Sequence, residues 1–268
     1  MRAGAAPGLK KRYFMETIGA EEFYNRLALA FDVMTDWPKR LTFEMPFLER
    51  NIRAISARSI LDMACGTGWH SIALAQKGYL TAGCDISSAM IHRARQNAAE
   101  SGVGVLFEVA DFSQLGKIPG AFDFLLCLGN SLPHVLSESA LREAFQKMKS
   151  KIKRGGGIII HNLNYDLRLK KQPRFFAAEG NAEVLVWRFA DYGTEFLTFH
   201  TALFERNGSK SPQWSVKVNS TLQKPWLTAD LDRILTEEGF QKIEHFGGLD
   251  GSAYEPDTSG DLVIVASC

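Results

Sequence analysis

The chain has 268 residues, of which 46% are hydrophobic and 23% are charged. These proportions are typical of a globular protein with a sizeable core, and no segment approaches the roughly 20 consecutive apolar residues that a membrane-spanning helix needs. A formal net charge of +1 provides no overall positive field for a nucleic acid backbone. The composition therefore excludes a membrane-embedded protein and argues against a nucleic acid or membrane partner.

The four cysteines, Cys65, Cys84, Cys127 and Cys268, contain no CxxC pair. Three of them lie in or beside apolar runs, which favours a reducing compartment over a zinc site or a disulfide framework. The first dozen residues are basic and lack the apolar core of a secretory signal, although a transit peptide would share part of this composition. We therefore expect a cytoplasmic protein without a bound metal and with a loose N-terminal tail.

A mainly helical segment is expected at about residues 16–56, ahead of a region with a different pattern of apolar residues. In that region, apolar runs of four to eight residues alternate with amphipathic segments. The alternation is typical of strands and helices in βαβ order. We expect strands at 59–64, 79–85, 103–111, 122–129 and 157–163, separated by helices at 69–78, 87–101 and 141–152.

These strands are apolar on both faces, as in a doubly wound α/β fold whose parallel sheet is covered by helices on both sides. Residues 164–226 instead alternate between polar and apolar, which indicates antiparallel strands with one buried face. A helix at 227–239 and strands at 240–246 and 261–267 return to the first pattern.

We therefore divide the chain into three parts. Residues 1–56 form a tail and a helical segment that covers the site, residues 57–163 and 227–268 form the α/β core, and residues 164–226 form a β-rich insertion. The insertion is rich in aromatic residues, most of which are expected to be core. Together they suggest an apolar lid over a bound substrate.

The first strand leads into a glycine turn, LDMACGTG (61–68). Gly66 and Gly68 allow the backbone to pass close to a ligand at the N-terminus of the following helix. Ser71 stands where a nicotinamide dinucleotide fingerprint would have its third glycine. Asp62, at the end of the strand, would oppose a pyrophosphate but suits a ligand with positive charge. S-adenosylmethionine, with its sulfonium and ammonium groups, is such a ligand.

Two more carboxylates follow expected strands. Asp85 ends the second strand and is placed to accept hydrogen bonds from both hydroxyls of a ribose. Asp111 and Phe112 follow the third strand, where they offer a carboxylate for an adenine amino group beside an aromatic ring.

Four segments, LDMACGTG, GCD, ADF and FDFLLCLGN, each at the carboxyl end of an expected strand, together resemble class I S-adenosylmethionine-dependent methyltransferases across residues 59–163. The resemblance implies a seven-stranded Rossmann-like sheet with its last strand antiparallel, and here a β-rich insertion after the fifth strand. It also implies S-adenosylmethionine as the cofactor, bound across the carboxyl edge of the sheet. The implied cofactor-binding residues are Arg40, Asp62, Ala64, Gly66, Gly68, Asp85, Ile86, Met90, Asp111, Phe112, Leu128 and Gly129.

A closer resemblance, to glycine and glycine/sarcosine N-methyltransferases, appears at LGNSLPH (128–134) and NYD (164–166). In such enzymes the stretch matching residues 31–41 supplies an arginine for the carboxylate of the cofactor, which makes Arg40 the candidate here. The alternative is that Arg40 is an ordinary surface charge of a helix, and that the neighbouring Trp37 serves packing.

The same resemblance fails at one position. Members that act on glycine have an arginine directly before NYD to pair with the carboxylate of the amino acid, whereas this chain has Leu163. An aliphatic side chain cannot replace that bidentate partner. Either Arg168, Arg174 or Arg188 supplies the missing cation, or the acceptor is not glycine.

Four residues are candidates for the chemistry itself. Asn130 is expected to orient the acceptor, the alternative being an ordinary turn residue. His134 is either a general base for a hydroxyl acceptor or a structural residue, and His161 is a comparable second candidate. Tyr165 follows the strand whose end borders the pocket and is expected to reach the acceptor.

The leading hypothesis is a small-molecule methyltransferase acting on an amine nitrogen, because a neutral amine needs orientation and burial more than a strong base. The alternatives are an O-methyltransferase with a histidine base and a cofactor-binding module without catalysis. A nucleic acid methyltransferase is disfavoured because the Asn/Asp-Pro-Pro-aromatic motif is missing after the fourth strand. A homo-oligomer is left open, since the N-terminal segment covers its own site or that of a neighbouring copy.

Overall fold

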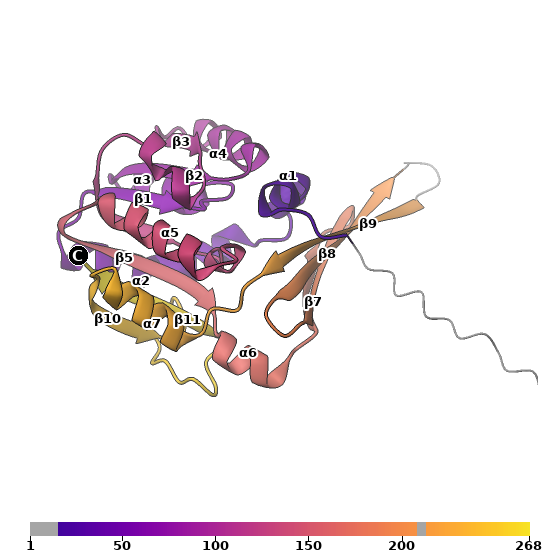
Figure 1. Ribbon diagram of the computed structural model, residues 1–268. Coiled ribbons are helices and arrows are strands. Elements are labelled where there is room, and N and C mark those ends of the chain that lie inside the picture. Colours follow the sequence, from indigo (N-terminus) through magenta and orange to yellow (C-terminus); the bar gives the residue numbers. More distant parts are fainter. Residues whose placement is uncertain (1–15, 208–212) are drawn as a thin grey trace, which may run out of the picture.

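The computed structural model describes residues 16–207 and 213–268, arranged around two sheets (Figure 1). The larger sheet has seven strands in the order β10-β11-β5-β4-β1-β2-β3, and the smaller has four in the order β6-β7-β8-β9. The tail expected at the N-terminus lies outside the described residues. Among the described residues, no helix is long and apolar enough to cross a membrane.

The seven-stranded sheet is parallel except around β11. It comprises β1 (Ser59–Met63), β2 (Leu80–Asp85), β3 (Leu106–Val109), β4 (Phe122–Cys127), β5 (Ile152–Leu163), β10 (Gln241–Phe246) and β11 (Asp261–Ser267). Strand β11 runs antiparallel to both of its neighbours, β5 and β10. The predicted sheet, with its last strand antiparallel, is therefore confirmed.

Helices cover both faces of this sheet, which explains the uninterrupted apolar runs. In β4, Phe124 and Leu126 pack on the side of α2 (Trp37–Ala54) and α3 (Trp69–Gln76), whereas Leu125 and Cys127 pack on the other side. The other side carries α5 (Glu138–Ser150) and α7 (Thr228–Glu237), while α4 (Ser88–Glu100) packs over β3. Because neighbouring side chains of a strand point to opposite faces, both sets must be apolar.

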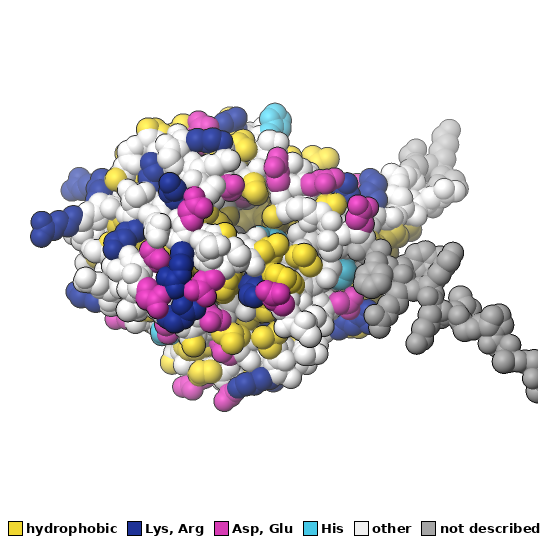
Figure 2. All heavy atoms as spheres, in the orientation of Figure 1, with side chains coloured by type: hydrophobic (Ala, Val, Ile, Leu, Met, Phe, Trp, Pro, Cys, Tyr) yellow, Lys and Arg dark blue, Asp and Glu magenta, His cyan; other side chains and the backbone are white. Residues whose placement is uncertain are grey.

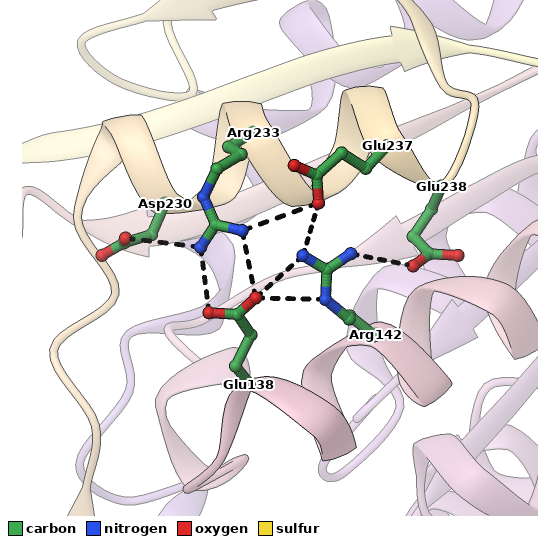
Figure 3. Close-up of polar contacts among 6 residues, drawn as sticks. All are labelled: Glu138, Arg142, Asp230, Arg233, Glu237 and Glu238. Atoms are coloured by element: carbon green, nitrogen blue, oxygen red, sulfur yellow. Dashed lines mark hydrogen bonds and ion pairs between the residues drawn. The ribbon is translucent and has the colours of Figure 1, made fainter.

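A network of ion pairs ties α5 to α7 on the surface (Figure 3). Arg142 of α5 pairs with Glu138, 2.8 Å away, with Glu238 at 3.3 Å and with Glu237. Arg233 of α7 reaches back to Glu138 at 2.9 Å. Because these side chains, apart from that of Glu238, are 29–47% exposed, we assign the network to the relative placement of the two helices and not to net stability.

The four-stranded antiparallel sheet follows α6 (Tyr165–Lys171). It consists of β6 (Phe175–Gly180), β7 (Val184–Tyr192), β8 (Leu197–Asn207) and β9 (Gln213–Gln223). One face packs against α1 (Ala20–Phe31), which Figure 1 shows between the two sheets. Val186 is buried on that face and its neighbour Trp187 is exposed on the other, as the alternating pattern predicts. Helix α6 was not expected; the side chain of Asn164 caps its first turn.

Candidate active site

A cavity of about 490 Å³ opens at the carboxyl edge of the parallel strands. Figure 2 shows the surface hollowed there, with hydrophobic side chains inside, between the positions that α5 and α1 occupy in Figure 1. The lining contains every residue predicted to contact the cofactor except Gly68. Gly68 has a φ of 83°, and a Cβ at this position would lie 2.7 Å from the ring of Phe107. It therefore serves close packing of the turn against β3.

Asp85 holds the glycine turn at one wall of the cavity. One carboxylate oxygen accepts a 2.9 Å hydrogen bond from the amide of Gly66, and the other accepts one of 2.9 Å from the amide of Ser87. Burial raises the pKa of Asp85 to about 6, although both amide hydrogen bonds favour the charged form. The remaining lone pairs of the carboxylate are available to donors of a ligand.

Asp62 is buried, with 2% of its surface exposed, and lines the same cavity. It accepts a 2.9 Å hydrogen bond from the hydroxyl of Ser71. Burial raises the pKa of Asp62, while His70, Ser71 and Arg40 act against this shift. Ser71, which stands where a dinucleotide fingerprint has its third glycine, thus donates a hydrogen bond to Asp62. This carboxylate suits a cationic ligand.

Arg40 brings a positive charge to the cavity lining. Its Nε lies 2.9 Å from Glu44, whose other oxygen lies 2.6 Å from Nε2 of His70. The guanidinium also stacks 5.1 Å from the ring centroid of Trp37. Burial alone would raise the pKa of Glu44, but the hydrogen bonds from His70 and Arg40 lower it to about 2. Glu44 therefore stays charged and fixes Arg40 beside Gly129.

Asp111 and Phe112 line the cavity next to α5. One oxygen of Asp111 accepts hydrogen bonds from the amides of Ser113 and Gln114, so that it caps the short helix η1 (Phe112–Lys117). Within the described residues no hydrogen bond to the second oxygen of Asp111 is found, and this oxygen is available to a ligand. The apolar remainder of the lining includes Ala64, Ile86, Met90, Ala110, Leu128 and Ala144.

Asp32, in the loop between α1 and α2, is a functional candidate that sequence reasoning missed. Its Oδ1 accepts hydrogen bonds from Thr67 of the glycine turn, at 2.6 Å, and from the indoles of Trp37 and Trp69, at 2.9 and 3.1 Å. Its Oδ2 faces Arg93 Nε at 3.1 Å and the amide of Asn97 at 3.3 Å. One carboxylate therefore fastens the N-terminal segment to the cofactor turn and to α4.

A polar network forms the other end of the cavity, starting from two lining residues, Tyr24 and His134. Nε2 of His134 lies 3.0 Å from the Tyr24 hydroxyl and 3.2 Å from the amide nitrogen of Gln223. Tyr165 donates to Gln223 at 3.3 Å and accepts from the side chain of Asn130 at 3.0 Å. Desolvation lowers the pKa of His134 to about 4, so its ring is neutral at pH 7.

The structure separates the four residues predicted for the chemistry. His134 lines the cavity, but Asn130 and Tyr165 are not among the described residues of the lining. The side-chain oxygen of Asn130 accepts a 3.0 Å hydrogen bond from the amide of Leu163, which ties the end of β4 to the end of β5. His161 lies outside the lining as well, where its Nδ1 accepts from the amide of Gly129 at 3.4 Å.

The cavity fits S-adenosylmethionine on chemical grounds. Asp62, Asp85 and Asp111 match a cationic ligand with ribose hydroxyls and an adenine amino group, and Arg40 matches its carboxylate. The apolar lining is suited to the adenine ring and the methionine chain, and the volume lies within the range of cofactor sites.

Comparison with known proteins agrees with this fit. Residues 60–156 match a family described as "Methyltransferase domain". A glycine/sarcosine N-methyltransferase of Parasynechococcus marenigrum (strain WH8102) is 31% identical over 238 residues, which cover 88% of this chain and 80% of that protein. A glycine/sarcosine/dimethylglycine N-methyltransferase of Actinopolyspora halophila is 35% identical over 225 residues, or 81% of this chain but only 37% of that longer protein.

Solved structures share the fold. The crystal structure of an S-adenosylmethionine-dependent methyltransferase from Clostridium acetobutylicum ATCC 824 superposes with a TM-score of 0.75 at 19% identity, over 91% of this chain and 98% of that one. The extended match to relatives that cover most of this chain decides the family. The chain belongs to the class I S-adenosylmethionine-dependent methyltransferases, in the family that includes the glycine/sarcosine N-methyltransferases.

Proposed function

We propose that this methyltransferase acts on the nitrogen of a small-molecule amine. The observation that carries the proposal is that His134, next to Tyr24 at the end of the cavity, has its Nε2 engaged by the Tyr24 hydroxyl at 3.0 Å and by the amide nitrogen of Gln223 at 3.2 Å. With a pKa of about 4 it is a weak base, so it is poorly suited to deprotonate a hydroxyl. An amine needs no such base once it is neutral. The names of the relatives, which are N-methyltransferases for glycine and its methylated forms, support the same choice.

The residues that hold the cofactor each have a proposed role. When bound, S-adenosylmethionine supplies an electrophilic methyl group on a sulfonium. Arg40 binds its carboxylate, Asp62 its ammonium, Asp85 its ribose hydroxyls and Asp111 its adenine amino group. Ala64, Gly66 and Gly129 leave room for the ligand at the backbone, and Ile86, Met90, Phe112 and Leu128 provide apolar contact.

The donor and acceptor roles within the network follow from His134 being neutral. The amide nitrogen of Gln223 can only donate, so the single lone pair of Nε2 in His134 accepts, and the hydroxyl of Tyr24 can only share that lone pair as a second donor. The oxygen lone pairs of Tyr24 are left to accept a hydrogen bond from the amine. Tyr24 would thereby orient the nitrogen toward the methyl group in a dry cavity.

Asn130 and Tyr165 act in this proposal through their neighbours. Asn130 fixes the Tyr165 hydroxyl, which in turn fixes Gln223 and His134. They are therefore positioning residues. We also propose that residues 16–56 cover the site, because α1 and α2 supply Tyr24 and Arg40 to the cavity, and that residues 164–226 form the acceptor lid.

The test is an acceptor screen with S-adenosylmethionine carrying an isotopically labelled methyl group, read by mass spectrometry. We expect the label on the nitrogen of a small amine. Matched reactions with the Asp85→Ala variant serve as the control for cofactor-dependent labelling. Label found on a hydroxyl oxygen, or on RNA or DNA but on no amine, would refute the proposal.

A further inference from the structure

The four-stranded sheet has a second face, which points away from α1 and which we call the outer face. It consists of the side chains that alternate with those packed on α1. Trp187 of β7 lies on it, beside Ala202 of β8, which is in turn beside Val218 of β9. By the same alternation the outer face also carries six further apolar residues: Phe175, Leu185, Phe189, Phe204, Trp214 and Val216.

Within the described part of the chain, no cluster of packed apolar side chains includes any residue of the outer face. Phe175, Trp214 and Val216 are 52–59% exposed, Val218 is 42% exposed and Trp187 is 37% exposed. Figure 1 shows α1 on one side of this sheet and no labelled element on the other. The outer face is therefore an apolar surface that lacks a partner among the described residues.

The aromatic side chains of the outer face hold one another in place. Phe175 stacks on Trp187 with ring centroids 5.3 Å apart, and the rings of Trp187 and Phe189 are 6.1 Å apart. Phe189 stacks at 4.5 Å on His200, whose Nδ1 lies 2.8 Å from the hydroxyl of Ser220. Side chains that are already ordered lose little conformational freedom when a partner binds. The outer face is thus organised for binding before a partner arrives.

The exposed apolar area of the outer face is large enough for a stable interface. A fully exposed aromatic side chain presents about 150–250 Å², so Phe175, Trp187 and Trp214 together leave about 300 Å² in water. Val216 and Val218 bring this to about 400 Å², a size at which an apolar patch marks an interaction site. This is about half of the roughly 800 Å² per partner that a standard interface buries. The polar rim of an interface supplies the remainder.

The charged side chains at the ends of the outer face are paired with each other. Arg174 lies 3.2 Å from Asp191 at one end, and Arg206 lies 3.1 Å from Glu183 at the other. A surface with a net charge would repel a copy of itself, and a cationic surface would suit anionic lipids. Neutral pairs do neither. The charges therefore permit contact between two copies and provide no attraction to a lipid surface.

We propose that the partner of the outer face is a second copy of this chain, so that the protein is a two-fold symmetric dimer joined through its four-stranded sheets. The sheets pack face to face, and the aromatic side chains of each copy interdigitate with those of the other. The inference is independent of the proposed amine methylation, because no residue of the outer face lines the cavity. The contact does, however, support the sheet on which α1 packs, and α1 supplies Tyr24 to the cavity.

Sedimentation equilibrium of the full chain tests the dimer. Val218→Glu places a carboxylate on the outer face, and Leu80→Glu places the same group at a 71% exposed apolar position of the seven-stranded sheet. We expect dimers for the unchanged chain and for Leu80→Glu. In Val218→Glu the dissociation constant should rise at least about 100-fold, because the symmetry buries the new charge twice. A monomeric unchanged chain, or an equally tight dimer of Val218→Glu, would overturn the inference.

Circular dichroism shows whether the Val218→Glu variant folds. If it does not, the double variant Val216→Thr/Val218→Thr takes its place, because threonine keeps the β-branched shape and adds only a hydroxyl. Leu80→Thr is then the control. We expect the dissociation constant to rise about tenfold in the double variant and to stay unchanged in the control. An unchanged dissociation constant in the folded double variant would contradict the proposed interface.

Co-sedimentation with vesicles of phosphatidylcholine and phosphatidylglycerol tests the competing partner. We expect the unchanged chain to remain in solution as a dimer. A monomer that binds the vesicles, and no longer does so as Trp187→Ser, would show that the outer face binds lipid and would overturn the dimer. If the chain is a dimer of the expected kind but methylates no amine, the proposed function fails while this inference stands.

Discussion

Removal of the Asp32 carboxylate tests how the N-terminal segment is attached to the cofactor turn. In Asp32→Ala, the donors of Trp37, Thr67, Trp69 and Asn97 lose their acceptor. Each such hydrogen bond contributes about 1 kcal/mol, and water entering the vacated space replaces part of the loss. The contribution of Arg93 is discounted because its side chain is 37% exposed. We expect the free energy of unfolding to fall by about 3 kcal/mol.

The Asp32→Asn variant distinguishes the hydrogen bonds of Oδ1 from those of Oδ2. An amide oxygen in place of Oδ1 still accepts from Trp37, Thr67 and Trp69. An amide nitrogen in place of Oδ2 faces donors from Arg93 and Asn97 and cannot accept from them. We therefore expect only about 1 kcal/mol of destabilisation, from the loss on the Oδ2 side.

Urea unfolding gives the free energies, and calorimetric titration with S-adenosylhomocysteine gives the effect on the cofactor site. Because Trp37 lines the cavity and Thr67 belongs to its turn, we expect binding to weaken about tenfold in Asp32→Ala, which corresponds to about 1.4 kcal/mol. The reasoning is refuted if Asp32→Asn is as unstable as Asp32→Ala, or if Asp32→Ala unfolds like the unchanged chain.

Four further predictions concern the candidate active site. Asp85→Ala should weaken calorimetric binding of S-adenosylhomocysteine at least about 100-fold, because two hydrogen bonds to a charged acceptor are lost. In the unchanged chain, affinity should fall as the pH drops below about 6, where Asp85 is protonated; a flat profile between pH 5 and 7 would contradict the assignment. The depressed pKa of His134 means that the folded protein resists its protonation, so the contribution of His134 to stability should be full above pH 6.5 and fall by up to about 3 kcal/mol toward pH 4, opposite in sign to the contribution of Asp85, whose pKa is raised. His134→Gln should remove that dependence, and urea midpoints that respond to acid as before would rule out His134 as its cause. Leu163→Arg should shift the acceptor profile toward small amino acids, and an unchanged mass-spectrometric profile would show that position 163 does not face the acceptor.

The sequence by itself determined that three carboxylates line one cavity. Asp62, Asp85 and Asp111 each follow a strand, and parallel strands connected by helices place all their carboxyl ends on one edge of the sheet. Once the strands were recognised, the three carboxylates had to face one cavity, and they line it. The alternating pattern of the insertion was equally informative. In a strand of a sheet with one covered face, every second side chain is buried, so apolar residues recur every two positions.

Tertiary structure alone decided the polar network around His134. Tyr24 and Gln223 meet His134 from positions 110 and 89 residues away, and no local pattern indicates which face of α1 or which end of β9 approaches the cavity. Asn130 follows β4 as predicted, yet its amide is used by Leu163 and Tyr165, a choice that depends on the neighbouring strand.

The residues that hold the cavity lining in place could not be predicted from the sequence, for the same reason. Asp32 and Glu44 look like ordinary charges of a helical segment, and only the packing of that segment on the glycine turn and on His70 makes them acceptors for buried donors. Side-chain periodicity records which residues are covered, but not by what. Partner choice between distant segments is set by the packing of the whole chain.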